Sequence, residues 1–151
     1  MLIRKLFGKF NCYQLNYSNS LQRMISKITE GVRVSIETNY QQEYSSPMQA
    51  HYVFTYRINI ENYGEHTIRL LRRHWFIYDA NGLIREVEGE GVVGQQPTLE
   101  PGTSHEYVSG CNLQTEMGKM RGTYLMERIV DGKQFSVIIP EFMLIAPFKL
   151  N

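Results

Sequence analysis

Residues 52–61 read YVFTYRINIE, and this stretch decides the fold class. Its even-numbered positions are aromatic or aliphatic, while Arg57, Asn59 and Glu61 lie between them. Successive side chains of a β-strand point to opposite faces of a sheet, so a period of two places one face of this run in a core. The run therefore predicts a half-buried strand, and its Tyr, Phe and Ile residues favour that structure.

Further runs along the chain are alternating or strongly apolar. They are residues 32–37, 66–78, 83–90, 105–109, 120–126, 135–140 and 142–150. The Asn81-Gly82 pair predicts a tight hairpin between two of these runs, and the turn at residues 130–133 predicts another. About eight strands without a convincing helix predict an all-β domain, either a sandwich or a small closed barrel. We favour the sandwich, because polar faces on several strands suit two packed sheets with solvated outer faces.

Two of these runs carry irregularities. Residues 66–78 do not keep strict alternation, and a β-bulge near Arg72 and Arg73 explains the slip. The last run is apolar enough to be packed on both faces, and Pro140 and Pro147 restrict it to a sheet edge or to a switch between sheets.

Length and composition limit the classes of protein to which the chain can belong. The chain has 151 residues, of which 42% are hydrophobic and 21% charged, as expected for one folded domain. The net charge is +1, and the basic excess typical of nucleic-acid binders is absent. The two cysteines, Cys12 and Cys111, are too few for a disulfide framework and predict a reducing, cytoplasmic location. No apolar run reaches the roughly 18 residues of a membrane span.

Residues 1–23 are predicted to be an N-terminal extension, separate from a single domain at residues 24–151. The extension holds four of the sixteen basic residues and none of the fifteen acidic ones. Its apolar residues are spaced as in a short amphipathic helix, which could touch a membrane surface, but the segment then becomes turn-like. We expect a poorly structured appendage or a start upstream of the natural one, and exclude it from the fold.

The most unusual segment is GEGVVGQQPTLEPG at residues 89–102, which contains the spacing G-x-G-x-x-G. In dinucleotide-binding folds this spacing ends a strand and begins a helix whose N-terminus holds phosphate. Here Gln-Gln-Pro follows and no helix is predicted, so that interpretation fails. Either the glycines line an anion-binding nest, or they provide backbone geometry for a tight crossing between sheets. The candidate anion-binding residues are Gly89, Gly91, Gly94, Arg72 and Arg73.

The long stretch from residue 89 to residue 127 resembles the ApaG family. The segments VRVSIETNY, YVFTYRINIENYG and LLRRHWFIYDANG extend the resemblance to about residues 24–148, and only the N-terminal extension departs from it. The resemblance implies an immunoglobulin-like or fibronectin type III-like β-sandwich of about seven to eight antiparallel strands. It also implies a genetic association with cobalt resistance and magnesium efflux, a protein-binding role, and a suggested binding of pyrophosphate or nucleotide at the glycine motif.

Metal-binding groupings are not evident in the sequence. The histidines, His51, His66, His74 and His105, are separated along the chain, so only the fold could gather them. Glu86, Glu88 and Glu90 share one face of a predicted strand, which could hold a hard cation but is better interpreted as a solvated face. We expect these acids to pair across the hairpin with the basic residues Arg69, Arg72 and Arg73.

Catalytic groupings are equally weak. Ser104, His105 and Glu106 are adjacent, so in a strand they face alternate sides and cannot form a proton relay. Cys111 has no neighbouring base and is interpreted as a small packed thiol. Trp75 is expected in the core rather than on a stacking platform. The segment 117–122, with two methionines and two cations, could either meet a partner or form an ordinary turn.

The sequence therefore predicts a non-enzymatic interaction domain that binds a protein partner and is linked indirectly to cobalt and magnesium homeostasis. No cofactor and no metal site are predicted. The alternative is a small-anion binder, or a phosphate hydrolase, at residues 89–102. A homodimer formed through an unpaired strand edge or through the C-terminal segment FMLIAPF is a further prediction.

Overall fold

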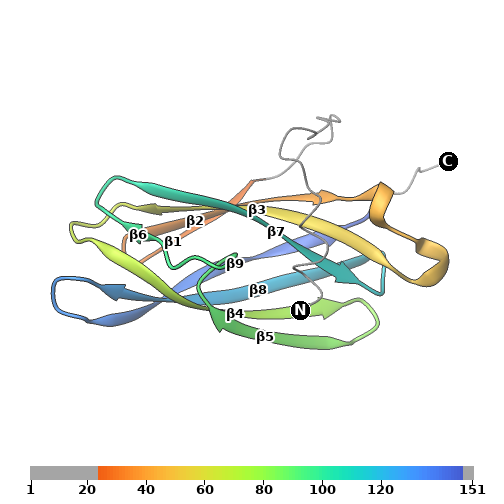
Figure 1. The fold of residues 1–151 in the computed structure, drawn as a ribbon. Helices are drawn as coiled ribbons and strands as arrows, with labels where there is room; N and C mark the ends of the chain where they lie inside the picture. Colours follow the sequence, from red (N-terminus) through yellow and green to blue (C-terminus); the bar gives the residue numbers. More distant parts are fainter. Residues whose placement is uncertain (1–23, 148–151) are drawn as a thin grey trace.

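The computed structural model describes residues 24–147, and the predicted extension 1–23 lies outside them. Two antiparallel β-sheets pack face to face (Figure 1). The first sheet has the order β1 (Ile25–Thr29), β2 (Val32–Tyr40), β3 (Tyr52–Asn62) and β7 (Ser104–Leu113). The second has the order β5 (Ile84–Glu90), β4 (Ile68–Asp79), β8 (Met117–Arg128) and β9 (Gln134–Ile145), with β6 (Thr98–Leu99) paired to β4. The predicted sandwich is confirmed.

The run that decides the fold class is strand β3, which lies inside the first sheet between β2 and β7. Its partners are in simple antiparallel register, with Ile58 opposite Ile36 on β2. Ile58 and Ile60 are both fully buried, whereas Arg57 and Glu61 are only partly buried on the other face. The alternation therefore assigns the two faces of β3 correctly.

The core lies between the two sheets and is rich in aromatic residues. Trp75 on β4 is 3% exposed, which confirms its predicted core position. Its ring meets the rings of Tyr124 and Phe142 edge to face, at centroid distances of 6.5 and 6.0 Å. Edge-to-face aromatic pairs of this kind add about 0.5–1.5 kcal/mol beyond the burial of their area. The tyrosines Tyr107 and Tyr124 bring hydroxyls into this core, and these are hydrogen-bonded to one another.

A β-bulge divides strand β4, close to where the sequence predicts one. The pairing with β8 shifts between Leu70 and Arg72. Because one extra residue is inserted, Arg73 lies opposite the buried Tyr124, on the same face of β4 as Trp75. Arg72 is exposed on the outer face. Adjacent strand residues face opposite sides, and the bulge therefore sets which arginine faces inward: Arg73 rather than Arg72.

The C-terminal region differs from the prediction. The two runs expected there form one strand, β9, at the edge of the second sheet, and Pro140 lies where its register with β8 shifts. Only one face is buried, because Phe142 and Leu144 are in the core whereas Met143 and Ile145 are exposed. Burial on both faces is therefore wrong. Prolines are tolerated at a bulge in an edge strand, because an amide is not needed there.

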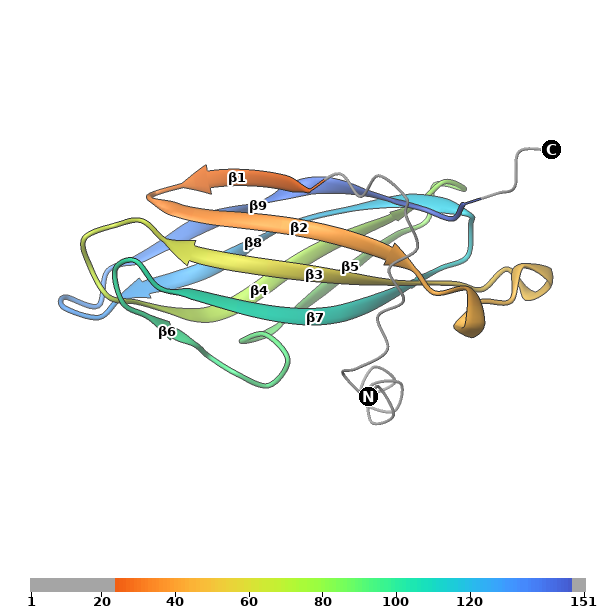
Figure 2. The same cartoon turned by 90° about the horizontal axis from the view of Figure 1, so that it is seen from above.

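Strand β1 was not predicted, because its sequence ISKIT has little burial to signal it. It pairs with β2 and lies along the edge strand β9 of the other sheet (Figure 2). The amide of Ile138 on β9 donates a hydrogen bond of 3.3 Å to Oγ1 of Thr29. This contact joins the two sheets along one side. Among residues 24–147, no helix is long and apolar enough to cross a membrane.

Candidate functional site

The glycine-rich loop begins where strand β5 ends. The amide of Gly91 donates to the carbonyl of Leu71 on β4, at 2.8 Å. A tight turn follows, in which Val92 and Gln95 exchange two backbone hydrogen bonds of 2.8 and 3.0 Å. Val92 is 1% exposed and anchors the loop in the core. The loop is therefore an ordered part of the sandwich, with no following helix, as the sequence predicts.

Gly89 makes room for Arg73. The two residues are direct cross-strand partners. A Cβ on residue 89 would lie 2.9 Å from Nη1 of Arg73, closer than Cβ atoms approach their neighbours. That same Nη1 donates hydrogen bonds of 2.9 Å to the carbonyl oxygens of Glu90 and Gly91. The guanidinium of Arg73 therefore holds the base of the loop.

Gly91 and Gly94 are required by backbone geometry to different degrees. Gly91 has φ +61°, and a Cβ there would lie 2.1 Å from the carbonyl oxygen of Gln95. Gly94 has φ +76° with open space around it. Between them, Val93 has φ 47° and is 62% exposed. A β-branched residue is rarely left-handed, so the exposed tip of this turn stores strain of about 1–3 kcal/mol.

The five predicted anion-binding residues do not converge on one point. Gly89, Gly91 and Arg73 meet at the base of the loop, where the arginine contacts carbonyl oxygens. Gly94 lies at the exposed tip, and Arg72 lies on the outer face opposite Glu90. Local packing and backbone geometry therefore explain why residues 89 and 91 are glycines. Anion binding at the loop stays a prediction.

None of the ion pairs expected between the acids of β5 and Arg69, Arg72 and Arg73 is present among residues 24–147. Arg69 pairs at 3.0 Å with Glu127 on β8. Glu86 and Glu88 instead lie beside His74, at 2.6 and 3.3 Å from its two ring nitrogens. The signal that could have found this grouping is the hairpin register, because counting back from the turn at Asn81-Gly82 places His74 opposite Glu88.

The outer face of the second sheet carries aromatic rings and cations side by side. The guanidinium of Arg121 lies 5.3 Å from the ring centroid of Phe76 and 5.6 Å from that of Tyr78. Nε of Arg121 also donates a 2.9 Å hydrogen bond to the Tyr78 hydroxyl. Nζ of Lys119 lies 5.2 Å from the centroid of the same Tyr78 ring. We call Phe76, Tyr78, Lys119 and Arg121 the cation–aromatic surface.

Exposed apolar side chains continue this surface toward the sheet edge. Met143 on β9 lies opposite Lys119, and Ile145 lies opposite Met117 at the start of β8. All three apolar side chains are 40–54% exposed. The segment 117–122 is therefore part of a strand rather than a turn. Of its two methionines, Met117 is exposed and Met120 is 1% exposed in the core.

The outer face of the first sheet has a different character. Its shallow depression is lined mainly by charged and polar side chains, among them two ion pairs. Arg33 and Glu61 are 2.7 Å apart, and their hydrogen bond lowers the pKa of Glu61. Arg57 and Glu106 are 3.8 Å apart. This face is polar, and its arginines form ion pairs with glutamates on the same face.

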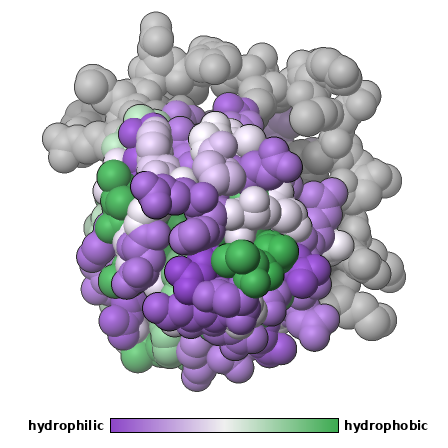
Figure 3. Space-filling view, turned by 90° about the vertical axis from the view of Figure 1, so that its left-hand side faces the viewer, coloured by the Kyte–Doolittle hydropathy of each residue, from purple (hydrophilic) through white to green (hydrophobic). Residues whose placement is uncertain are grey.

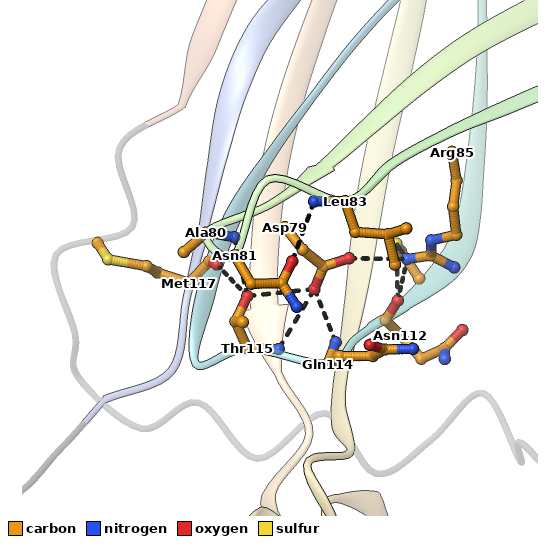
Figure 4. Close-up of polar contacts among 10 residues, drawn as sticks. Asp79, Ala80, Asn81, Leu83, Arg85, Asn112, Gln114, Thr115 and Met117 are labelled. Atoms are coloured by element: carbon orange, nitrogen blue, oxygen red, sulfur yellow. Dashed lines mark hydrogen bonds and ion pairs between the residues drawn. The ribbon is translucent and has the colours of Figure 1, made fainter.

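A polar network around Asp79 lies at one end of the sandwich (Figure 4). The β8–β9 turn lies at the other end. Oδ1 of the buried Asp79 accepts hydrogen bonds from the amides of Gln114 and Thr115, at 2.7 and 3.2 Å. Within residues 24–147, Oδ2 accepts no hydrogen bond and lies 3.8 Å from Nη2 of Arg85. Arg85 also donates to the carbonyl of Asn112. The network fixes the turn between β7 and β8.

Cys111 lies beside this network. Its Sγ is 3.9 Å from Nη2 of Arg85, and the side chain is buried. Burial raises the pKa of Cys111 to about 11, and the nearby guanidinium offsets this effect only in part. The thiol therefore remains protonated at neutral pH, in agreement with its interpretation as a packed residue.

A hydrophobic cluster also marks the end of the sandwich that carries the β8–β9 turn. This end faces the viewer in Figure 3, where a compact hydrophobic patch lies among hydrophilic residues. On that turn, Ile129 and Val130 are 44% and 74% exposed. The turn itself is held by Arg128, which pairs with Asp131. Two exposed aliphatic residues are a small patch compared with the outer face of the second sheet.

The fold defines a single β-sandwich of the immunoglobulin or fibronectin type III kind. A family model described as ApaG domain matches residues 42–128. Protein ApaG of Paramagnetospirillum magneticum is 48% identical over 126 residues, 83% of this chain and 96% of that protein. Protein ApaG of Anaeromyxobacter dehalogenans is 46% identical over 128 residues, 85% of this chain and 100% of that protein.

A solved structure gives the same result. The crystal structure of the putative ApaA protein from Bordetella pertussis superimposes with a TM-score of 0.74 at 46% identity. The match covers 77% of this chain and 94% of that one. The chain belongs to the ApaG family, as its sequence resemblance predicts.

Proposed function

We propose that this domain is a non-enzymatic protein-binding module that docks its partner on the outer face of the second sheet. The observation that carries the proposal is the cation–aromatic surface together with the exposed Met143 and Ile145. The proposal retains the indirect link to cobalt and magnesium homeostasis implied by the family resemblance, because a binding module acts through its partner.

The chemistry of this face supports the proposal of a protein interface. Protein interfaces are enriched in aromatic residues, Met and Arg, and binding energy concentrates in a few Tyr, Trp and Arg side chains. Here Arg121 is held over Phe76 and Tyr78 before any partner arrives. Little side-chain entropy is then lost on binding. On the outer face of the first sheet, Arg33 and Arg57 are engaged by Glu61 and Glu106, and the one cation–aromatic contact among the described residues there is that of Arg33 with Tyr63.

The non-enzymatic part of the proposal is supported by the chemical state of the residues that could act. Cys111 is buried and its pKa is raised, so it is a poor nucleophile at neutral pH. His105 lies opposite Ile60 on the inward face of β7, stacked on Tyr107, whereas Glu106 lies on the outward face. The adjacent Ser104, His105 and Glu106 therefore do not form a relay, in agreement with the alternation of a strand.

Affinity capture with two matched charge reversals tests the proposal. The full-length wild type, Arg121→Glu and Arg57→Glu are immobilised, and proteins retained from a cell lysate are quantified by mass spectrometry. We expect a partner that is retained by the wild type and by Arg57→Glu but reduced by about tenfold or more with Arg121→Glu. Circular dichroism first confirms that all three are folded. Equal retention by wild type and Arg121→Glu, or no specific retention, would overturn the proposal.

A further inference from the structure

The geometry points to a divalent-metal site on the β4–β5 hairpin, formed by His74, Glu86 and Glu88. One donor atom from each of these residues lies within 4.8 Å of the other two. The site is a histidine with two carboxylates rather than a group of acids alone. This inference goes beyond the proposed function and does not depend on it.

The hairpin register brings the three residues together. Glu88 is the direct cross-strand partner of His74, and Glu86 is the partner of Phe76. Glu86 and Glu88 are two residues apart on β5, so they share one face of the sheet. His74 is on the same outer face of β4, and the three side chains are between 30% and 58% exposed. The site is therefore open to an ion from solvent.

The distances suit a coordination shell. Nε2 of His74 is 2.6 Å from Oε1 of Glu86, and Nδ1 is 3.3 Å from Oε1 of Glu88. Ligand atoms at about 2.0–2.2 Å from a metal are themselves about 3 Å apart. The two carboxylates meet different ring nitrogens, and an imidazole binds a given ion through only one of them, so the glutamate at the other nitrogen must rotate toward the ion for all three residues to share it. The remaining coordination positions face solvent and would be filled by water.

The donor set indicates the class of metal. A metal-binding imidazole is neutral, and the two carboxylates together carry a charge of −2. This charge balances that of a divalent cation. Imidazole favours first-row ions such as Ni²⁺ and Zn²⁺ over Mg²⁺ and Ca²⁺, which prefer oxygen ligands alone. The ring is also held in place, because its centroid lies 4.6 Å from that of Phe76.

A doubly protonated His74 that bridges the two carboxylates would produce the same contacts without an ion. The two arrangements differ in their response to metal, and a titration separates them. The full chain is used without an affinity tag, after treatment with chelator, in a Cys12→Ser background that removes a competing thiol ligand. Ni²⁺ is titrated by calorimetry, with Mg²⁺ as the comparison ion.

We expect the wild type to bind one equivalent of Ni²⁺ and to bind Mg²⁺ far more weakly. Affinity for Ni²⁺ should fall at least about tenfold in His74→Ala and in the double variant Glu86→Gln/Glu88→Gln. Glu90→Gln is the matched control, because Glu90 lies on the same face of β5 outside the cluster, and it should bind as the wild type does. Melting curves without metal confirm that each variant is folded.

A second readout locates the ion. Ni²⁺ is paramagnetic, so at substoichiometric amounts it should broaden the amide resonances of β4 and β5 around residues 74 and 86–88 in two-dimensional NMR spectra. Absence of Ni²⁺ binding by the folded wild type would leave His74 as an ion-pair bridge and overturn the proposal. Equal binding by the wild type and the double variant, or broadening elsewhere, would overturn it as well.

Discussion

Gly89 and Arg73 lie directly opposite one another on β5 and β4, and the guanidinium of Arg73 occupies the space that a side chain on residue 89 would need. The arginine uses this position to donate to the carbonyls of Glu90 and Gly91. The first glycine of the G-x-G-x-x-G spacing is thus a packing partner of an arginine.

Gly89→Ala should destabilise the fold by about 1–2 kcal/mol, because the new methyl group displaces the guanidinium from the loop carbonyls. The measurement is a double-mutant cycle with Arg73→Ala, followed by urea unfolding. In the Arg73→Ala background, Gly89→Ala should cost at least about 1 kcal/mol less than in the wild type. Costs that simply add would contradict the proposed pairing.

Gly91→Ala and Gly94→Ala should differ in their cost, although both residues have a positive φ. At Gly94 a methyl group meets open space, so only the left-handed backbone is penalised, at about 1 kcal/mol. At Gly91 the methyl group also collides with the carbonyl of Gln95, which adds about 1–3 kcal/mol. Thermal unfolding of the two variants compares them, and equal melting temperatures would refute the assignment.

Pyrophosphate should not stabilise the protein through the glycine-rich loop. Arg73 already contacts loop carbonyls, and Arg72 is on the other face of the sheet. Thermal shift at millimolar pyrophosphate, with and without Mg²⁺, measures this directly, since a ligand stabilises by RT ln(1 + [L]/Kd). A concentration-dependent rise in melting temperature that Arg72→Ala abolishes would instead favour anion binding at this loop.

Asp79→Ala should destabilise the fold by about 2 kcal/mol, because the amides of Gln114 and Thr115 lose their acceptor. Asp79→Asn keeps an oxygen that can accept these bonds, so it should cost less. Urea unfolding at neutral pH provides the comparison. Should the two variants be equally destabilised, the carboxylate charge near Arg85 would matter more than the hydrogen bonds to the turn.

The stability of the fold should fall as pH rises above about 9. Burial raises the pKa of Cys111 from 9.0 to about 11, so between these values the folded state holds a proton that the unfolded state releases. That difference lowers the free energy of unfolding by about 1–3 kcal/mol across the window. Burial also raises the pKa of Tyr56 to about 12, which extends the effect to higher pH.

Urea unfolding of wild type and Cys111→Ala between pH 8 and 11 isolates the thiol. The variant should lose less stability per pH unit than the wild type, although the buried tyrosines keep some slope. Parallel curves would mean that Cys111 does not contribute to the alkaline loss.

Most of the secondary structure could be predicted from the sequence. A half-buried strand shows an alternation of apolar and polar residues within a short segment, and this alternation identifies its two faces. The run at residues 52–61 and the Asn81-Gly82 turn are both found as predicted. Strand bounds are not predictable where the apolar pattern in the sequence is weak or continuous. Strand β1 has almost no apolar face, and the apolar β9 was divided into two strands at Pro140 although it is one.

The candidate sites were less predictable, because they depend on which faces and registers meet. Arg72 and Arg73 are both predicted to contact an anion, but adjacent strand residues face opposite sides, and the bulge sets that Arg73 is the one that faces inward. His74 was set apart from Glu86 and Glu88, but the register of the hairpin places all three on one face. Adjacent residues in a strand diverge, and residues far apart in the chain converge across it.

The sequence by itself determined the all-β class, most strand positions, the hairpins and the membership of the ApaG family, because each follows from patterns contained within short segments or from overall similarity. Only the tertiary structure decided that Arg73 supports the glycine-rich loop, that Arg121 lies over two aromatic rings, and that His74 meets two carboxylates. These contacts join different strands, so they arise from strand register and sheet packing. Local periodicity constrains register and packing but does not encode which charged side chains will meet.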